Sequence, residues 1–180
     1  IAYAAQQATP REIIMVDIPS GTFEMGSSDS VLYGRENERP QHIVNISSLV
    51  ASETEITERQ FFDIMTDGIE AFSGCEDCAV AFVSFREAVL FCNALSIIDG
   101  YEPAYGLNES EILFFIDTNG YRLPTEAEWE YLCRAGSGND FTNGDISVCC
   151  DQLDENLDLV AWYGYNANEA VNIVATKEAN

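Results

Sequence analysis

Three tetrapeptides of one type mark where helices can begin in this chain. Residues Thr57–Gln60, Ser84–Glu87 and Thr125–Glu128 each place a Ser or Thr three positions before a Glu or Gln. In this capping box the hydroxyl accepts a hydrogen bond from an otherwise unpaired N–H of the first turn, and the later side chain reaches back to the N–H of the Ser or Thr. The sequence therefore predicts three helices, separated by long stretches without a helical pattern.

The residues after these boxes indicate which helix faces are buried. Apolar side chains at helical spacing follow the second box and predict a buried stripe there: Phe85, Ala88, Val89, Cys92 and Leu95. A weaker stripe of Trp129, Leu132 and Cys133 follows the third box, and Gly136 and Gly138 are expected to end that helix. The first helix is predicted to be short.

Short apolar runs between polar loops predict strands over residues 12–18, 22–25, 43–50 and 111–116. Asn119-Gly120 is a tight-turn dipeptide, so residues 121–123 are expected to return alongside 111–116. No repeat or linker divides the chain. The pattern predicts an α+β fold with unusually long loops, and such loops are commonly functional or held by disulfides or ions.

The charge balance limits the partners. The 180 residues contain 8 Lys and Arg against 31 Asp and Glu, which gives a net charge of −23. Such a surface repels phosphate backbones and anionic lipid headgroups, so we expect no nucleic-acid partner. No apolar run reaches the roughly 18 to 20 residues that a membrane span requires. Cations, basic proteins and neutral molecules are the favoured partners.

Six cysteines stand at positions 75, 78, 92, 133, 149 and 150. An even number in a short acidic chain predicts two or three disulfides and an oxidising compartment, and the pairing stays open. The disulfide candidates are Cys75, Cys78, Cys149 and Cys150, because the other two lie in helical patterns and are expected to be buried thiols. A zinc site on the C-x-x-C at 75–78 is the alternative, but the chain has no second C-x-x-C to complete it.

Side chains typical of catalysis are scarce. His42 is the only histidine, which argues against catalytic triads and histidine metal clusters. Acidic clusters at 36–38, 53–55 and 151–158 have the carboxylates that calcium needs but not the spacing of an EF-hand loop. The favoured interpretation of each cluster is a solvated acidic face.

Five blocks together resemble the formylglycine-generating enzyme (sulfatase-modifying factor) family. They follow one another in the family's order, at residues 18–27, 36–42, 53–57, 83–96 and 120–136. The block from Gly120 to Gly136 resembles the family most closely, and residues 161–163 and 176–180 extend the likeness weakly. Five ordered blocks are far more specific than any one of them.

The resemblance implies a variant of the C-type lectin-like fold, with long loops and little regular secondary structure. It places an N-terminal extension at residues 1–11 and the domain at residues 12–180. Enzymes of this family oxidise a sulfatase cysteine to formylglycine with oxygen and a copper ion held by two cysteines. Relatives include variable ligand-binding proteins.

The chain also departs from the family pattern. The later family blocks, including the copper-binding cysteine pair, have no counterpart here, which implies a domain incomplete at its C-terminus. No catalytic residue can therefore be carried over, and copper is expected only if that C-terminal part exists. Asn156 and Asn166 stand near the positions of family calcium ligands, which makes them the calcium candidates.

These observations favour a non-catalytic binding or assembly module that is exported, either secreted or held in the periplasm or at the cell surface. The first alternative is a partial formylglycine-generating oxidase, and the second is a variable lectin-like ligand-binding protein. The large aromatic side chains Trp129, Tyr131, Trp162 and Tyr163 are expected to form a surface that needs covering. The expected cover is another protein chain or the missing C-terminal segment.

Overall fold

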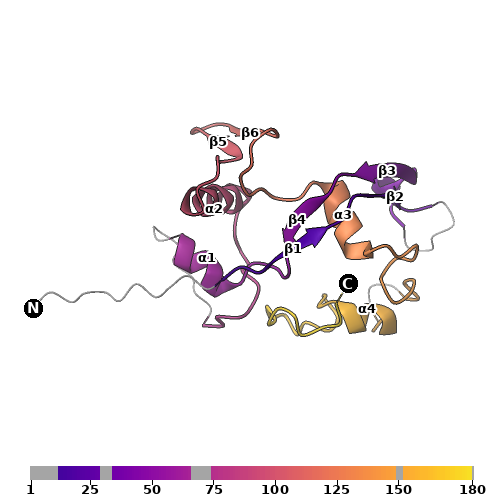
Figure 1. Ribbon diagram of the computed structural model, residues 1–180. Helices are drawn as coiled ribbons and strands as arrows, with labels where there is room; N and C mark the ends of the chain where they lie inside the picture. Colours follow the sequence, from indigo (N-terminus) through magenta and orange to yellow (C-terminus); the bar gives the residue numbers. More distant parts are fainter. Residues whose placement is uncertain (1–11, 29–33, 66–73, 149–151, 180) are drawn as a thin grey trace, which may run out of the picture. The chain divides into compact units, whose positions relative to one another are not determined.

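A computed structural model describes residues 12–28, 34–65, 74–148 and 152–179 (Figure 1). The chain forms two compact units. Unit 1 comprises Ile1–Ile14 and Glu55–Leu123, and unit 2 comprises Met15–Thr54 and Pro124–Asn180. The predicted N-terminal extension, residues 1–11, lies outside the described residues. Within the described ranges, no helix is long and apolar enough to cross a membrane.

Unit 2 begins with an antiparallel ribbon made of four strands. Strand β1 (Met15–Ile18) pairs with β4 (Leu49–Ser52), and β2 (Gly21–Met25) pairs with β3 (His42–Ile46). Paired residue numbers add up to 67 in both pairs, as in 15 with 52 and 25 with 42, so one register continues through the interruption. A short 3-10 helix, η1 (Glu36–Glu38), lies in the connection between β2 and β3.

The interruption corrects one sequence prediction. Residues 43–50 were expected to form a single strand, but β3 ends at Ile46 and β4 starts at Leu49. In the shared register Pro19 stands opposite Ser48, and a proline has no N–H to donate to its partner strand. The ribbon is therefore unpaired around Pro19, and the apolar run is divided in two.

Helix α3 (Glu126–Arg134) packs against this ribbon through the residues of the Gly120–Gly136 block. The ring of Tyr131 lies 5.5 Å from that of Phe23, and its hydroxyl donates to the carbonyl of Pro19 at 3.2 Å. A Cβ at Gly21 would lie 2.3 Å from the Tyr131 hydroxyl oxygen, so a larger residue at position 21 would have to displace the Tyr131 side chain. The block that carried the family resemblance thus fixes a helix onto the ribbon.

Helix α4 (Glu155–Val160) was not predicted. Its N-cap is Asp154, which is almost completely buried and belongs to the acidic run 151–158. The expectation of a solvated acidic face is wrong for this residue, because its carboxylate is used inside the fold. Both of its oxygens accept backbone hydrogen bonds, from Ser147 and Val148 and from Asn156 and Leu157.

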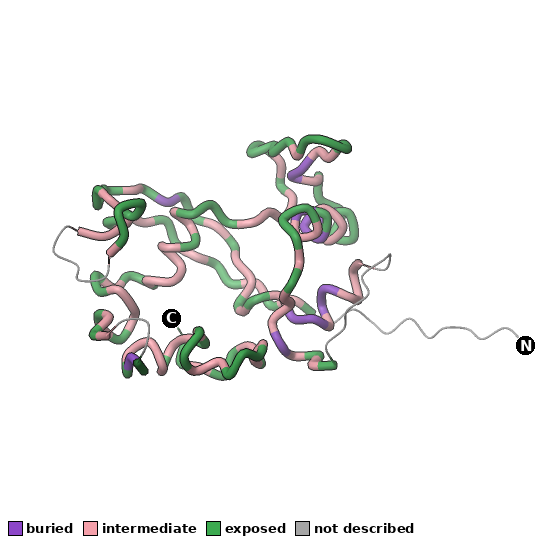
Figure 2. The backbone as a smooth tube through the Cα atoms, turned by 180° about the vertical axis from the view of Figure 1, so that it is seen from behind, coloured by how far each residue is buried: buried purple, intermediate pink, exposed green. Residues whose placement is uncertain are grey.

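Unit 1 contains helices α1 (Glu58–Ile64) and α2 (Phe85–Ile98) and the hairpin of β5 (Tyr105–Leu107) and β6 (Ile112–Phe114). Capping boxes at Thr57, Ser84 and Thr125 are present in the structure, which confirms the three predicted helix starts. The fully buried core of unit 1 is small, and buried stretches of the chain are short (Figure 2). Its members are Phe61, Val89, Phe91, Cys92, Ala104 and Tyr105.

Two details of unit 1 differ from the predictions. Phe85 is 62% exposed, because it is the first residue of α2 and lies beyond the end of the core, whereas Phe91 stacks on Phe61 with ring centroids 5.1 Å apart. Strand β6 pairs with β5 and not with residues 121–123. The Asn119 side chain instead accepts a hydrogen bond from the N–H of Glu102 at 2.9 Å, which ties the expected turn to the segment after α2.

Candidate functional site

The outward face of α2 carries apolar side chains where a solvent-facing helix is normally polar. Leu90, Ile97 and Ile98, here called the α2 face, are spaced seven and eight residues apart and so lie on one side of the helix. Ile97 is 66% exposed and Ile98 58%, whereas Ser96 beside them is completely buried. The helix therefore offers apolar side chains on both faces, and only one face is covered by the core of unit 1.

A second group of exposed apolar side chains follows on the hairpin of unit 1. Residues 113–116, here called the β6 segment, are four consecutive large apolar residues, and all four are exposed. Strand β6 ends at Phe114, so Leu113 and Phe114 point to opposite faces of the hairpin, and Phe115 and Ile116 follow directly after the strand. Phe114 also packs against Tyr105, with ring centroids 5.4 Å apart. Exposed apolar groups of this kind typically mark interaction sites.

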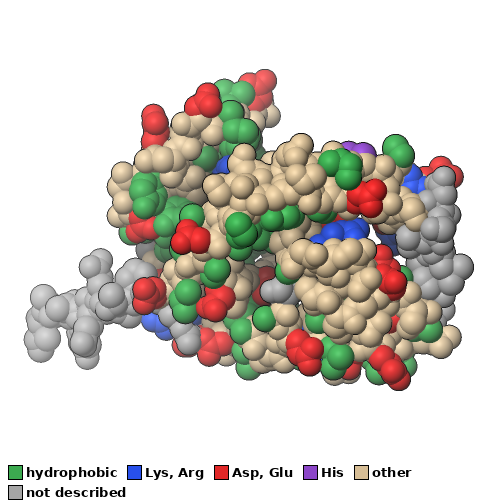
Figure 3. Space-filling model, turned by 45° about the vertical axis from the view of Figure 1, so that its right-hand side comes forward, with side chains coloured by type: hydrophobic (Ala, Val, Ile, Leu, Met, Phe, Trp, Pro, Cys, Tyr) green, Lys and Arg blue, Asp and Glu red, His purple; other side chains and the backbone are tan. Residues whose placement is uncertain are grey.

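The chain is strongly acidic, with a net charge of −23. Asp and Glu are spread over the visible face of the molecule in Figure 3, whereas Lys and Arg occur at only a few points. Two arginines of unit 1 are already engaged: Arg59 pairs with Asp63 at 2.8 Å, and Arg86 donates to the carbonyl of Asn108 at 3.0 Å. Exposed apolar side chains on a strongly acidic chain are complementary to an apolar segment that carries basic residues.

The described cysteines have different environments, and the prediction that both helical cysteines are buried holds for Cys92 but is wrong for Cys133, which is only half-buried on α3. Cys75 and Cys78 form a disulfide with a Cα–Cα distance of 5.3 Å. Cys92 is a buried thiol, and burial raises its pKa to about 11. Cys149 and Cys150 lie outside the described residues. The described cysteines of unit 1 do not fit a copper site with two thiolates, because one pair is oxidised and Cys92 is held as the neutral thiol.

The two calcium candidates hold loops around α4. Asn166 donates through Nδ2 to Oδ1 of Asp158 at 2.7 Å and to the carbonyl of Ala161 at 3.0 Å, and its Oδ1 accepts from the N–H of Tyr163. Asn156 donates to the carbonyl of Asp145 at 2.8 Å. The described residues contain no cluster of three or more His, Cys, Asp or Glu side chains that could hold a metal. Calcium at these two positions stays a prediction.

The four aromatic residues expected to form one surface have different roles in unit 2. Trp129 is 60% exposed on α3, and Trp162 is partly exposed. Tyr131 packs on the ribbon, and the hydroxyl of Tyr163 accepts a hydrogen bond from the N–H of Asp154 at 2.9 Å. Trp129 is therefore the most exposed of the four, and Trp162 is exposed in part, with Lys177 over its ring.

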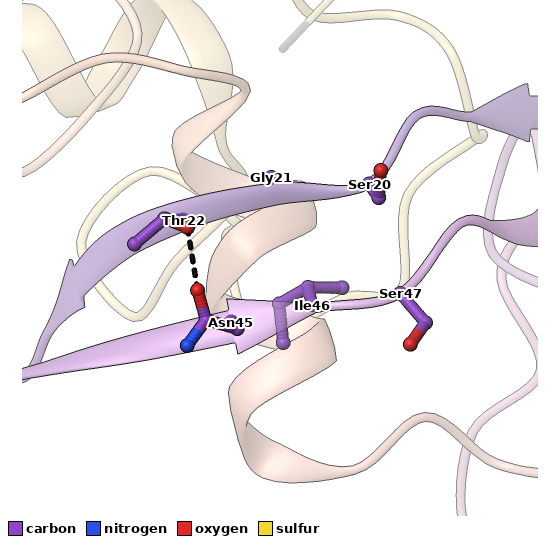
Figure 4. A pocket seen from close by; sticks show the side chains of 6 residues that line it. All are labelled: Ser20, Gly21, Thr22, Asn45, Ile46 and Ser47. Atoms are coloured by element: carbon purple, nitrogen blue, oxygen red, sulfur yellow. Dashed lines mark hydrogen bonds between the residues drawn. The ribbon is translucent and has the colours of Figure 1, made fainter.

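The remaining polar candidates offer little for catalysis. His42 is exposed at the start of β3, with its Nδ1 2.9 Å from the carbonyl oxygen of Pro40. An open hollow on β2 and β3 is lined by Ser20, Gly21, Thr22, Asn45, Ile46 and Ser47. Thr22 and Asn45 point toward one another and share a hydrogen bond of 2.7 Å (Figure 4). The hollow is wide open and has no charged side chain in its lining.

Sequence reasoning missed both apolar groups of unit 1. Residues 111–116 were interpreted as an ordinary strand, and the second helix was described only by its buried stripe. A signal was present, because Leu90, Ile97 and Ile98 are apolar yet fall off that stripe. Apolar residues on the second face of a helix indicate either a deeper core or an interaction surface.

Known proteins resemble this chain along almost its whole length. The family described as "Sulfatase-modifying factor enzyme 1-like domain" matches residues 2–180. Chaperone protein LppX of Paenibacillus barcinonensis is 32% identical over 171 residues, which cover 86% of this chain and 55% of LppX. The chain thus spans little more than half the length of this relative.

Solved structures share the fold at low sequence identity. Treponema denticola variable protein 1 is 24% identical with a TM-score of 0.73, covering 92% of this chain and 66% of its own. PvdO from Pseudomonas aeruginosa is 18% identical with a TM-score of 0.66, covering 96% of this chain and 69% of its own. CarF is 22% identical with a TM-score of 0.65, covering 94% of this chain and 74% of its own.

Proposed function

This chain belongs to the family of sulfatase-modifying factor enzyme 1-like domains, and from that premise we propose that it is a non-catalytic binding module with a chaperone role. Its substrate would be an apolar segment of another protein that also carries basic residues. The name of LppX, a chaperone protein that is 32% identical, supports this class of function.

The observation that carries the proposal is the exposed apolar surface of unit 1. Its exposed side chains are Ile97 and Ile98 on the α2 face and residues 113–116 of the β6 segment. Covering apolar surface gains about 25 cal/mol for each Å² removed from water, so these groups favour association with another apolar chain. A surface that binds mainly through burial of apolar side chains tolerates different client sequences, as a chaperone requires.

Charge gives the second half of the specificity. At a net charge of −23, long-range attraction brings basic segments to the chain and repels acidic ones. The exposed tryptophans Trp129 and Trp162 of unit 2 support the partner that we expect for the whole protein, because tryptophan is enriched among the residues that dominate binding energy. This partner would be another protein chain or a further segment of the same protein.

We also propose that the protein is exported. The disulfide between Cys75 and Cys78 supports this, since disulfides form and persist in oxidising compartments such as the periplasm or the cell exterior. The protein can be expressed in cells with a reducing cytoplasm and in cells with an oxidising one. Mass spectrometry of the cysteine peptides then tests whether the Cys75–Cys78 disulfide needs an oxidising compartment to form.

A labelled peptide of alternating Leu and Lys residues is the probe for the binding role, and the same peptide with Glu for Lys is its control. We expect fluorescence anisotropy to show tighter binding of the basic peptide. The double variant Ile97→Ser/Ile98→Ser should weaken it by about tenfold or more, because about 1.4 kcal/mol of lost apolar burial corresponds to a tenfold change in Kd. Both residues are exposed, so the fold should persist.

The matched control is Ile43→Ser/Ile173→Ser, which removes two exposed isoleucines from unit 2. This variant should bind the basic peptide like the wild type. Equal losses in both variants, or equal binding of the Lys and Glu peptides, would reject the proposed surface. Suppressed light scattering of heat-aggregating malate dehydrogenase, lost in the Ile97/Ile98 variant alone, tests the chaperone role itself.

Family membership favours one second candidate, oxidation of a sulfatase cysteine to formylglycine by the whole protein. Incubating the protein with copper, oxygen and a cysteine-containing sulfatase peptide decides between the two. Conversion of that cysteine to an aldehyde, detected by peptide mass, would establish the oxidase and remove the non-catalytic assignment.

A further inference from the structure

The disulfide between Cys75 and Cys78 closes a very short loop. Its two residues are three positions apart in the sequence. Stabilisation by a disulfide increases with the length of the loop that it closes, so this bond adds less to folding than one across a long loop would. The C-x-x-C spacing is also the one found in thiol–disulfide oxidoreductases. Both facts point to a bond that can open and close.

The two cysteines differ in exposure. Cys78 is only 4% exposed, whereas Cys75 is partly exposed at the start of the loop. Exchange starts when a thiolate attacks a disulfide sulfur that it can reach. The structure therefore makes Sγ of Cys75 the attacked atom and Cys78 the leaving thiolate.

The same loop completes the first turn of α1. The N–H of Glu58 donates a hydrogen bond to the carbonyl of Cys78 at 2.9 Å, and the N–H of Arg59 donates one to the carbonyl of Glu76 at 3.1 Å. These two N–H groups belong to the first turn of a helix, which has no acceptors of its own within the helix. The N–H of Val80 also donates to the carbonyl of Ile56 at 2.8 Å. The position of the disulfide loop thus decides whether the helix that carries Phe61 is fully capped.

We propose that Cys75–Cys78 is a thiol–disulfide exchange site for a dithiol reductant, and that its redox state sets how firmly the loop caps α1. A thiolate of the dithiol attacks Sγ of Cys75, the Cys75–Cys78 bond breaks, and Cys78 leaves as a thiolate that takes a proton from water. The second sulfur of the dithiol then loses its proton and displaces Cys75 from the mixed disulfide. The reductant ends as a disulfide, and the chain has gained two electrons and two protons.

Charge selects among reductants. Glu76 and Asp77 lie between the two cysteines, and Glu76 pairs with Arg59 at 3.4 Å with its own side chain largely exposed. Carboxylates beside a disulfide repel an anionic thiol and attract a cationic one. The site should therefore react faster with cationic reagents than with anionic ones, and added salt should reduce this difference.

The first experiment uses the wild-type full chain under native conditions. The folded protein is incubated with dithiothreitol, quenched with acid and alkylated, and peptide mass spectrometry locates the alkylated cysteines. We expect Cys75 and Cys78 to be alkylated while the near-UV circular dichroism stays that of the folded protein. Alkylation of this pair only where denaturant unfolds the chain would overturn the proposal.

A matched pair of variants tests which of the two cysteines a reagent can reach, which is the ground for assigning Cys75 as the attacked sulfur. Cys78→Ser leaves Cys75 as the reactive thiol, and Cys75→Ser leaves Cys78. We expect Cys75 to form a mixed disulfide with cystamine at least ~10-fold faster than Cys78 does, because access controls the rate. Cystamine, a cation, should also react with Cys75 faster than oxidised glutathione, an anion, at low salt. Equal rates for the two cysteines would contradict the assignment of Cys75.

Amide hydrogen exchange tests the coupling to α1 and needs no variant. Reduction of the wild type should speed hydrogen exchange at the N–H groups of Glu58 and Arg59, because their hydrogen bonds to the loop are less firmly held once the disulfide is open. The N–H of Glu128 is the internal control. It donates a hydrogen bond to the Thr125 side chain at the N-cap of α3, and its exchange rate should not change. Unchanged protection at both residues of α1 after full reduction would reject the link between the disulfide and the helix.

Discussion

The two units differ in how many side chains they bury. Unit 1 buries an apolar cluster with Phe61, Val89 and Phe91 among its members, and it also buries the polar residues Thr57, Glu58, Gln60 and Ser96. In the described part of unit 2 only Ile46 and Asp154 are buried, and several contacts of this unit involve charged groups. For example, the Glu130 carboxylate accepts a hydrogen bond from the N–H of Gly26 at 2.9 Å. The guanidinium of Arg134 donates to the carbonyl of Gly26.

The difference shows that one short chain can be stabilised in two ways. Burial of apolar side chains depends on volume and not on pH, so the apolar cluster of unit 1 should respond mainly to large-to-small substitutions. Hydrogen bonds to charged groups depend on ionisation, so unit 2 should respond to acid and to removal of single carboxylates. Trp129 and Trp162, the two tryptophans of the chain, both lie in unit 2, so tryptophan fluorescence reports on that unit alone.

The largest expected effect is in unit 1, for Phe61→Ala. Phe61 is 2% exposed and stacks on Phe91, and loss of a buried phenylalanine typically costs about 3–5 kcal/mol. Urea unfolding followed by tyrosine and far-UV signals should show an earlier transition for unit 1. The control is Phe85→Ala, at an exposed position of α2, which should shift the urea midpoint of unit 1 only a little. A tryptophan transition that moves by the same amount as the tyrosine signal would mean that the two units unfold as one.

Asp154→Ala is the corresponding test in unit 2. The Asp154 carboxylate accepts from four backbone N–H groups and from the hydroxyl of Ser147, and its removal leaves these donors without their acceptor. We expect a loss on the order of 3 kcal/mol in the tryptophan-detected transition. Exposed Asp117→Ala, in unit 1, should leave it unchanged. A loss below about 1 kcal/mol, the usual cost of removing an N-cap alone, would mean that water replaces the carboxylate.

Acid should weaken unit 2 through the same carboxylate. Burial opposes the ionisation of Asp154 and would raise its pKa, but hydrogen bonds from Leu157, Ser147 and Val148 outweigh burial and hold the pKa well below its usual range. A lowered folded-state pKa means that the stabilisation is complete above the unfolded value of about 3.9 and is lost as the pH falls below it. The tryptophan-detected free energy of unfolding should therefore fall from about pH 4 downward, and Asp154→Asn should reduce this slope.

Local sequence signals predicted the helix starts but not the pairing of distant segments. The boxes at Thr57, Ser84 and Thr125 act within one turn of helix, and all three are confirmed. The mixed fold with few regular elements is confirmed as well, since it rested on five ordered blocks of a family that matches residues 2–180. The return of residues 121–123 alongside 111–116 was wrong, because the choice of a strand partner depends on contacts that a turn dipeptide does not specify.

The candidate site was harder to predict for a related reason. Whether Ile97 or Leu113 is exposed depends on whether other segments of the chain pack over it, and a local sequence pattern does not specify these distant contacts. The buried role of Asp154 was hidden in the same way. An acidic run indicates a solvated face in most proteins, and only the three-dimensional position of residues 147–148 brings backbone donors to this carboxylate.

A smaller effect is expected at the N-cap of α1. The Thr57 hydroxyl accepts from the N–H of Gln60 at 3.2 Å, and replacing such a cap by alanine typically costs about 1 kcal/mol. Thr57→Ala should lower the stability of unit 1 by that amount at every pH between 5 and 8, because neither partner titrates. Thr57→Ser keeps the hydroxyl and should retain most of the stability. A dependence on pH in this range would show that a charged group, and not the hydroxyl, controls this end of α1.

The smallest effect concerns Lys177, which fastens the C-terminal segment to α4. Its Nζ lies 3.2 Å from Oδ1 of Asp158 and 4.1 Å from the ring centroid of Trp162, and it also donates to the carbonyl of Asp158. Lys177→Met should lower the stability of unit 2 by about 0.5–1 kcal/mol, because ion pairs and cation–π contacts near the surface are weak. Lys177→Arg keeps the charge and is the control. Because the cation sits on the indole ring, the emission of Trp162 should change in the Met variant even where the free energy barely does, and unchanged emission would place the lysine away from the ring in solution.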